Sequence, residues 1–586
     1  MINQLKKLWF LIDRKQKKAL GVLLFLLSIG MLLEIIGLGI IIPVFSIILN
    51  PEDFESFEIL NFRVGRFFTN VNHSDLVLYL LGILVLIYTV KSFFLSYITH
   101  KQNQILERLH AKLSSDLFAN YINQSYLFHI NRDFAEILKN LNSEIRFFSN
   151  YFKFILSISV ELLLSISVLL TILIIEPVGA ISVGFFFIFV SLIFYLSIKK
   201  RLTSWGIERE KYDNISSKIR VESFSVIKDV ILYDKHKYFT DYYKSSQNNL
   251  INIIASHQTL SQVSRFFLEL ISVIGVVFFI IIMQIKGESI FSLISSLGVI
   301  VAASFRIIPS INRILGGIQN LKYYSPSVSI IYNELKLKSE KLIKDYDSKL
   351  TFLNSINFDN ISFRYSKKSK WILKNISFKI CRGETVGIIG ESGSGKSTFV
   401  DILNGLLTPL SGRIEVDKVD ISSNLIQWHK NIGYVGQEIF LLDDSIKKNI
   451  AFGIDEAEIS EKKIIELIKT VELSDFVKDL DRGVDSNVGE RGVKLSGGQR
   501  QRIGIARALY NDPEILIFDE ATASLDTPTE KKIMKSIYKL KKSKTIIIVA
   551  HRLSTLYKCD KIYEINNKII LQKDKLWKKN PLQSSA

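Results

Sequence analysis

The chain has 586 residues, a formal net charge of +18 and 48% hydrophobic residues. This length exceeds one hydrophobic core and indicates two domains. The positive charge does not indicate nucleic-acid binding, because cytoplasmic loops of membrane proteins collect lysine and arginine and no basic stripe is interleaved with aromatic residues. The only cysteines are Cys381 and Cys559, which excludes a disulfide framework and fits a reducing cytoplasm.

The N-terminus is basic and precedes an apolar run from Ala19 to about Leu49. This run is longer than the apolar region of a signal peptide and has no small-residue cleavage site. We therefore expect a retained membrane span.

Residues 1–335 are predicted to form an all-helical membrane domain, because a bilayer core of about 30 Å needs about 20 apolar residues in a helix. Six stretches meet this length: about 20–48, 76–98, 154–175, 178–198, 266–285 and 290–308. The segments after the second and fourth spans are long and polar, so the positive-inside rule places them, the N-terminus and the C-terminal half in the cytoplasm. They contain few helix breakers, and we expect spans 2 to 5 to continue as helices into the cytoplasm. The amphipathic segment 57–68 is expected to lie on the outer surface.

The rest of the chain is predicted to be an α/β domain at 353–575, after a charged linker at 336–352 and before a polar tail at 576–586. Alternation of polar and apolar residues begins at Ile356, and strand and helix patterns then alternate. This pattern favours a mainly parallel sheet covered by helices.

A glycine-rich loop follows the apolar strand 386–389 and has the sequence GESGSGKS at 390–397. This is a P-loop: its glycines let backbone N–H groups converge on a phosphate. Lys396 is expected to reach the β- and γ-phosphates of a nucleotide, and Ser397 to contact Mg²⁺.

A second apolar strand at 515–518 ends in Asp519 and Glu520. A carboxylate in this position can hold Mg²⁺, and the next can polarise the attacking water. The alternative is that Asp519 and Glu520 are ordinary solvated surface charges. Two acidic residues directly after an apolar strand argue against this interpretation.

The segment Leu495–Gln499 (LSGGQ), between the P-loop and these acids, resembles the signature of ABC transporters. With six spans in the same chain, the resemblance is to exporter-type half-transporters. It implies an adenine-stacking Tyr365, a Q-loop at Gln437, a D-loop at 524–526 and a switch histidine at His551. By this resemblance the ATP contacts are Tyr365, Gly390, Ser392, Gly393, Gly395, Lys396, Ser397, Thr398, Ser496, Gly497, Gly498, Gln499 and Asp526. The catalytic residues are Glu520, His551 and Gln437, and the Mg²⁺ ligands are Ser397, Gln437 and Asp519.

In this family two ATPase domains close head-to-tail on two ATP molecules. One chain carries one P-loop and one signature, so the resemblance implies a dimer. Both Glu520 and His551 are present, which favours a homodimer. Short helices near 122–132 and 212–222 are expected to pass the motion of the ATPase domains to the spans.

Charged residues within spans are expensive and are candidates for substrate contact: Lys91, Arg265 and Arg306, with Arg313 just beyond. Their similar depth predicts a ring of cations near the inner-leaflet headgroups, which would suit an anionic lipid headgroup. The alternatives are snorkelling toward the interface and pairing of Arg265 with Glu269.

The stretch 305–314 (FRIIPSINRI) and the later tyrosines at 323–324 and 332 are similar to PglK-type lipid-linked oligosaccharide flippases, as is SRFFLE at 264–269. The implied cargo is a polyprenyl-diphosphate-linked oligosaccharide moved from the inner to the outer leaflet of the cytoplasmic (inner) membrane. An exporter of drugs, peptides or lipid A-like lipids on the same scaffold is the alternative. The six spans count against a soluble ABC ATPase acting on ribosomes or DNA.

Overall fold

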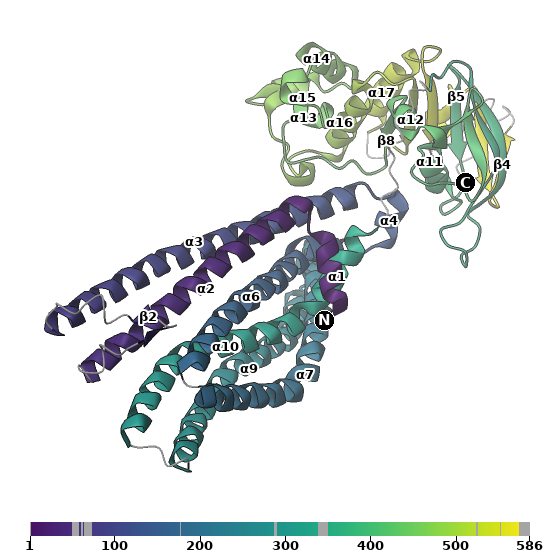
Figure 1. The fold of residues 1–586 in the computed structure, drawn as a ribbon. Coiled ribbons are helices and arrows are strands. Elements are labelled where there is room, and N and C mark those ends of the chain that lie inside the picture. The colour runs from purple at the N-terminus through teal and green to yellow at the C-terminus, as the bar shows by residue number, and fades with distance from the viewer. Residues whose placement is uncertain are drawn as a thin grey trace. The chain divides into compact units, whose positions relative to one another are not determined.

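A computed structural model describes residues 2–49, 58–59, 62–63, 73–175, 177–285, 290–337, 350–522, 526–550 and 553–573, some by their backbone alone. The chain divides into two compact units (Figure 1). We call Met1–Gln124 with Asn131–Ser339 the helical unit, and Ser125–Ile130 with Glu340–Ala586 the α/β unit.

Long helices build the helical unit, and each contains one of the predicted spans. They are α2 (Arg14–Leu49), α3 (His73–Ile122), α6 (Ile145–Ile175), α7 (Pro177–Ser225), α9 (His236–Ile285) and α10 (Ile290–Leu335). The short helix α1 (Ile2–Leu11) precedes them, and α5 (Phe134–Lys139) and a π-helical turn (Asn140–Glu144) lead into α6. Helix α10 continues through Pro309, so Arg306 and Arg313 lie on one helix.

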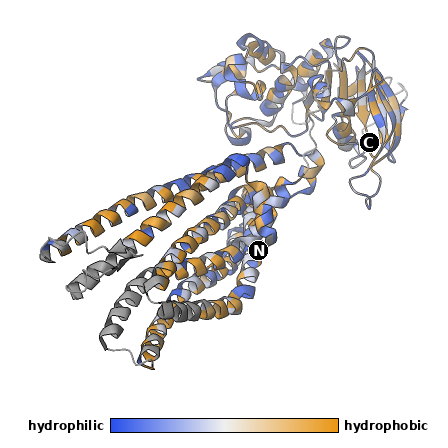
Figure 2. Ribbon diagram, viewed as in Figure 1, coloured by the Kyte–Doolittle hydropathy of each residue, from blue (hydrophilic) through white to orange (hydrophobic). Residues whose placement is uncertain are grey.

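Stretches of hydrophobic residues run along these helices (Figure 2). Where side chains are described, four stretches are long and apolar enough to cross a membrane: Arg14–Gly37, Val77–Ile122, Phe134–Leu170 and His236–Phe278. The predicted spans at 178–198 and 290–308 fall largely among residues whose side chains are not described. The count of six spans therefore stays a prediction.

The helices extend past the apolar stretches, as expected, but the connecting segments differ in part from the prediction. A short helix, α4 (Tyr126–Asn131), lies within the expected segment 122–132. The second expected helix at 212–222 is wrong, because α7 continues to Ser225 and the short helix α8 is Ile227–Leu232. No glycine or proline interrupts the sequence from 207 to 225, so nothing there ends the helix.

The segment 57–68, expected at the outer surface, contains strands rather than a helix where the structure describes it. Glu58–Ile59 (β1) and Phe62–Arg63 (β2) pair as antiparallel strands. The remainder of that segment, most of the linker and the whole polar tail lie outside the described residues. Leu350 and Phe352, at the end of the predicted linker, are already buried in the core of the α/β unit.

The α/β unit contains a six-stranded sheet in the order β12-β11-β5-β10-β9-β8. All neighbours pair in parallel except β11 and β12, which confirms the mainly parallel sheet. A second, antiparallel sheet in the order β4-β3-β6-β7 was not predicted. The strands are β3 (Ser355–Phe363), β4 (Leu373–Cys381), β5 (Thr385–Ile389), β6 (Ser411–Val416), β7 (Val419–Asp420), β8 (Ile432–Val435), β9 (Ile515–Asp519), β10 (Thr545–Val549), β11 (Lys561–Asn566) and β12 (Ile569–Lys573).

The central strands β5, β9 and β10 are buried on both faces, which explains why their sequences are continuous apolar runs. In β9, Leu516 and Phe518 face one hydrophobic core, while Ile515 and Ile517 face the other. Successive side chains of a strand point to opposite faces, so both cores fix the register of β9. The helices of the unit are α11 (Lys396–Leu403), α12 (Leu425–Lys430), α13 (Ile446–Ile450), α14 (Glu461–Thr470), α15 (Ser474–Lys478), α16 (Gly497–Tyr510) and α17 (Thr527–Lys539).

Helix α7 packs closely on α10 at Gly206. A Cβ atom added there would lie 2.4 Å from the carbonyl oxygen of Tyr323. We expect Gly206→Ala to lower the free energy of unfolding by about 1–3 kcal/mol, because the helices must move apart. Chemical denaturation of the full chain in detergent micelles measures this change.

Gly82→Ala in α3 is the matched control, because a Cβ at Gly82 meets nothing within 4 Å. It should be neutral or raise stability by up to about 1 kcal/mol through helix propensity. Equal effects of the two substitutions would contradict the close approach of α7 and α10.

Candidate functional site

The P-loop connects the end of β5 to the first residue of α11, Lys396. The Lys396 side chain is buried, and its Nζ donates to the carbonyl oxygens of Gly390 (2.8 Å) and Glu391 (2.9 Å). Burial lowers the pKa of Lys396, while Glu520 and Asp519 act in the opposite direction. The ammonium is thus held against the loop backbone, at the N-terminus of a helix.

Two glycines show why the loop needs this sequence. A Cβ at Gly390 would lie 2.6 Å from Ser394 Oγ and 2.7 Å from the carbonyl oxygen of Ile565. Gly393 has φ of +79°, and a Cβ there would meet nothing within 4 Å. The loop therefore has open space beside its backbone at Gly393. The loop leads directly into α11, whose first residue is Lys396. This donor set fits the phosphates of ATP.

The two predicted acids lie at the end of β9. Glu520 has φ of +51°, which is uncommon for a residue other than glycine, and its N–H donates to the carbonyl oxygen of Val549 at 3.0 Å. Gln437 Nε2 donates to Glu520 Oε2 at 3.0 Å. Burial, followed by the charge of Glu520, raises the pKa of Asp519. The structure thus brings the predicted Q-loop residue and the predicted catalytic acid together.

Tyr365 and Thr398, both predicted to contact ATP, also meet. Tyr365 Oη lies 3.2 Å from Thr398 Oγ1. The Tyr365 ring packs edge-on against the Phe363 ring, with 5.2 Å between the ring centres. One edge of the ring is therefore held beside α11, while 36% of the residue stays exposed. An exposed aromatic face beside the P-loop helix suits stacking on a base.

The signature begins α16. Ser496 is the N-cap: its Oγ accepts from Gln499 N at 3.2 Å, and Gln499 Oε1 accepts from Ser496 N at 2.7 Å. This reciprocal pair is a capping box, which fixes the helix N-terminus where backbone N–H groups attract a phosphate. Asp526 caps α17 in a similar way, accepting from Thr529 N at 3.1 Å.

Some predicted site residues lie outside what the structure describes. These are His551, the first two residues of the predicted D-loop at 524–525, and the side chain of Arg306. Their roles stay predictions.

Sequence reasoning assigned no role at the ATP site to two residues that interact with Asp519, Tyr434 and Asp401. Tyr434, on β8, donates from its Oη to Asp519 Oδ2 at 3.5 Å, and burial followed by Asp519 raises its pKa. Asp401, on α11, has its pKa raised to about 6 by burial and by Asp519. Neither residue type carries a functional signal at its position, so only the fold reveals them.

Three of the four predicted substrate cations have an acidic partner. Lys91 Nζ lies 2.9 Å from Glu34 Oε2, with Lys91 8% and Glu34 1% exposed. Arg265 Nε donates to Glu269 Oε1 at 3.0 Å on the surface of α9, as considered above. Lys91 is therefore neutralised inside the helical unit.

The third pair is Arg313 with Glu161. Arg313 Nη1 donates to Glu161 Oε1 at 2.6 Å, and Ser310 Oγ donates to Glu161 Oε2 at 2.7 Å. Glu161 is buried on α6, while the Arg313 side chain is 55% exposed. Sequence reasoning missed Glu34 and Glu161, although the rule that marks charged residues in spans as functional candidates would have found both.

The α/β unit carries the site of a P-loop ATPase, and long apolar helices form the other unit. Together they define a membrane protein with a fused nucleotide-binding domain. Residues 19–304 match the family described as ABC transporter transmembrane region, and residues 373–523 match ABC transporter. A protein of Rickettsia bellii (strain RML369-C), of the export ATP-binding/permease type, is 30% identical over 86% of this chain and 88% of its own length. The chain belongs to the ABC transporter family, in which ATP hydrolysis is coupled to transport.

Other relatives match over less than half of this chain. The heterocyst differentiation ATP-binding protein HepA of Nostoc sp. (strain PCC 7120 / SAG 25.82 / UTEX 2576) is 37% identical over 48% of each chain. The alpha-hemolysin translocation ATP-binding protein HlyB of Escherichia coli O157:H7 is 44% identical over 37% of this chain. The matches span about half of HepA and 30% of HlyB.

A solved structure of a bacterial Atm1-family ABC exporter with ATP bound is similar to this chain with a TM-score of 0.79. The two share 22% sequence identity over 95% of each chain. This likeness confirms the predicted fold class, a helical transmembrane domain followed by an ABC ATPase domain of the exporter type.

The raised pKa of Asp401 predicts a pH-dependent stability. Between its ordinary value of 3.8 and about 6, the folded state binds more protons at Asp401 than the unfolded state does. Asp401 therefore lowers the free energy of unfolding above pH 6, and this penalty shrinks as the pH falls toward 4. We expect Asp401→Asn to raise the unfolding temperature at pH 7.5, and to raise it less at pH 5, measured by thermal unfolding of the full chain in detergent.

Asp417→Asn is a control of opposite sign. Burial would raise the pKa of Asp417, but backbone N–H donors from Leu353, Ser355 and Asn354 outweigh it and lower the pKa. This substitution should lower the unfolding temperature at pH 7.5. A gain for Asp401→Asn that did not depend on pH would contradict the titration of this carboxyl group.

Proposed function

We propose that this chain hydrolyses ATP to drive export across the cytoplasmic membrane, with its N-terminus and its α/β unit in the cytoplasm. One observation carries the ATPase part: the 3.0 Å hydrogen bond from Gln437 to Glu520. This bond joins a carboxylate and a side-chain amide at the sheet edge where the P-loop begins, which supports an orienting role for Gln437. Membership of the ABC transporter family supports the coupling to transport.

Each predicted site residue has a separate proposed role in ATP hydrolysis. Lys396 neutralises charge on the β- and γ-phosphates, and Tyr365 stacks on adenine. Glu520 polarises the attacking water and accepts its proton, while Gln437 holds Glu520 in place. Mg²⁺ would supply a Lewis acid at the phosphates, and Ser397, Gln437 and Asp519 would hold it. His551 is proposed to sense the γ-phosphate.

A homodimer would complete two such sites. No hydrogen bond among the described residues connects the P-loop with Ser496 or the start of α16. Two phosphate-binding helix N-termini in one unit that are not bonded to each other suit a head-to-tail dimer, in which the signature of one subunit closes the ATP site of the other. Glu520 in each copy would make both sites competent.

For the cargo, we propose a polyprenyl-diphosphate-linked oligosaccharide, moved from the inner to the outer leaflet. The resemblance of 305–314 and 264–269 to PglK-type flippases supports this choice. Arg313 supports it physically, because its guanidinium is half-exposed and is held in place by Glu161. An arginine oriented in this way can form paired hydrogen bonds with a pyrophosphate. Arg306 and Arg265 would add charge, and Lys91 is the weakest of the four because it is buried against Glu34.

One observation favours the alternative, an exporter of drugs, peptides or lipid A-like lipids. The acids Glu34, Glu161 and Glu269 each neutralise a candidate cation. Helices whose charged side chains are paired in this way suit a cargo that is apolar or carries both charges.

ATP-dependent flipping of a pyrophosphate-linked lipid oligosaccharide in proteoliposomes tests the proposal. Glu520→Gln should lower ATP hydrolysis roughly 100-fold or more and abolish flipping. Arg313→Gln combined with Glu161→Gln removes the guanidinium together with its buried partner, so no carboxylate is left unpaired. This double variant should keep ATP hydrolysis and lose roughly tenfold in flipping rate.

Arg382→Gln combined with Glu514→Gln is the matched control, since these residues form an exposed pair at 2.8 Å in the α/β unit. It should leave flipping and hydrolysis unchanged. Wild-type protein that hydrolyses ATP and leaves the lipid in place would overturn the cargo and keep the ATPase. Stimulation of hydrolysis by drugs or lipid A precursors would then support the alternative.

A further inference from the structure

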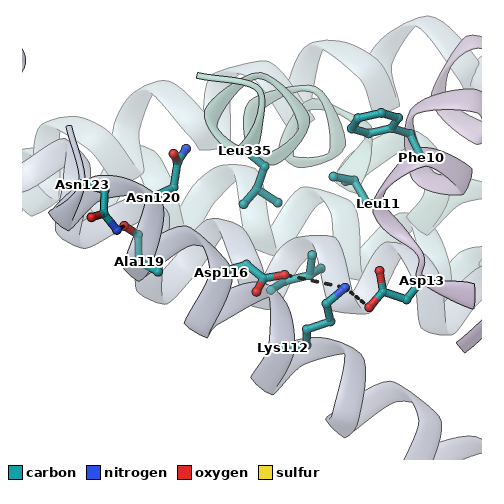
Figure 3. A pocket seen from close by; sticks show the side chains of 10 residues that line it. Phe10, Leu11, Asp13, Lys112, Asp116, Ala119, Asn120, Asn123 and Leu335 are labelled. Carbon is teal, nitrogen blue, oxygen red and sulfur yellow. Dashed lines mark hydrogen bonds and ion pairs between the residues drawn. The ribbon is translucent and has the colours of Figure 1, made fainter. Parts of the chain in front are cut away.

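Helix α1 of the helical unit separates two cavities of different character. On one side, a polar pocket of about 410 Å³ is lined by residues such as Asp13, Lys112, Asp116 and Asn120. Lys112 pairs there with Asp13 and Asp116 (Figure 3). On the other side, α1, α2 and α6 enclose an apolar groove of about 620 Å³. A helix with a polar pocket on one flank and an apolar groove on the other suits a position at a membrane surface.

The apolar groove contains mostly leucine and isoleucine, with two lysines and one tryptophan. Its lining includes Trp9 on α1, Gly21 on α2 and Leu156 on α6, and Lys6 and Lys17 also line it. Trp9 is 57% exposed, and Lys17 Nζ lies 4.6 Å from the centre of its ring. Tryptophan is enriched at the headgroup level of membranes. The volume lies within the range of sites that hold a small molecule or a lipid chain.

The charge around the groove is strongly positive. Residues 1–33 contain six lysines and arginines and one acid, Asp13, and Asp13 is engaged by Lys112. Among the described residues, neither Lys6 nor Lys17 forms an ion pair, whereas Lys7 donates to Ser329 Oγ at 2.9 Å. A cluster of this size next to a membrane span is typical of segments that bind anionic lipids.

We propose that this groove binds one anionic phospholipid of the surrounding membrane, with an acyl chain along Leu24 and Leu156 and the phosphate beside Lys6 and Lys17. Charge complementarity favours this occupant. An uncharged lipid would account for the leucines of the groove, but not for its two lysines, which form no ion pair among the described residues. The site would fix α1 against α2 and α6 through a resident lipid. This inference rests on the membrane location of the family and is independent of the cargo.

Quenching of Trp9 fluorescence by brominated lipids tests the site in the full chain reconstituted in vesicles. The Trp9 signal is the difference between wild type and Trp9→Phe. Brominated phosphatidylglycerol should quench it more than the same fraction of brominated phosphatidylcholine. Lys6→Gln with Lys17→Gln should reduce this preference by roughly fivefold per lysine. Lys15→Gln with Lys18→Gln removes the same charge from lysines that do not line the groove, and should keep the preference.

A second variant fills the groove. A Cβ at Gly21 meets nothing within 4 Å, so the backbone there has room for a side chain. Gly21→Leu should add bulk to the groove and reduce quenching by both lipids. Gly82→Leu, at an equally open glycine of α3 outside the groove, is the control and should leave quenching unchanged.

Three results would overturn the proposal. Equal loss of preference in the two lysine variants would show diffuse surface charge rather than a site. Unchanged quenching in Gly21→Leu would show that lipid does not enter the groove. Conversion of dimers to monomers by Gly21→Leu, measured by light scattering after size-exclusion chromatography, would show that a second copy of the chain occupies it.

Discussion

The ATP site depends on one constraint, the parallel pairing of β5, β10 and β9. Strand β10 lies between the other two and is parallel to both, so the carboxyl ends of all three strands lie at the same sheet edge. The P-loop follows β5, and Asp519 and Glu520 end β9. Gln437, which follows the neighbouring strand β8, reaches Glu520 at that edge. Gln437 and Glu520 are 83 positions apart in the chain, and they meet because hydrophobic cores on both faces hold the strands in register.

The helical unit follows a different rule, because charges inside an apolar bundle are costly unless they are paired. Lys91 with Glu34 and Arg313 with Glu161 satisfy it across different helices, α3 with α2 and α10 with α6. These pairs leave little net charge and fix the rotation of the helices that carry them. The same rule explains a difference from the prediction. The lysines and arginines alone led us to expect a ring of free cations, but the described side chains form ion pairs instead.

Features that depend on local sequence were predictable, whereas most features that depend on long-range pairing, apart from the mainly parallel sheet, were not. The P-loop, the signature and the long helices each follow from a continuous stretch with a strong glycine or apolar pattern. The antiparallel sheet β4-β3-β6-β7 and the contact of Tyr434 with Asp519 join segments that are distant in the sequence. Neither segment contains a sequence motif that predicts the contact. The short helix expected at 212–222 was only partly predictable. Helical structure was expected there, but the segment belongs to α7, and no glycine or proline marks the end of α7 at Ser225.

The ion pair at Arg313 also constrains which cargo the helical unit can select. A ligand that binds this guanidinium competes with Glu161, whose carboxylate is already 2.6 Å away and receives a second hydrogen bond from Ser310. A single weak acceptor gains little by such an exchange. A pyrophosphate offers more charge and more oxygen atoms, and can contact the exposed part of the guanidinium while Glu161 keeps its own bond. If the proposed cargo is correct, this pair would favour multiply charged phosphates over weakly charged anions, because only the former would gain enough from a cation that is already paired with Glu161.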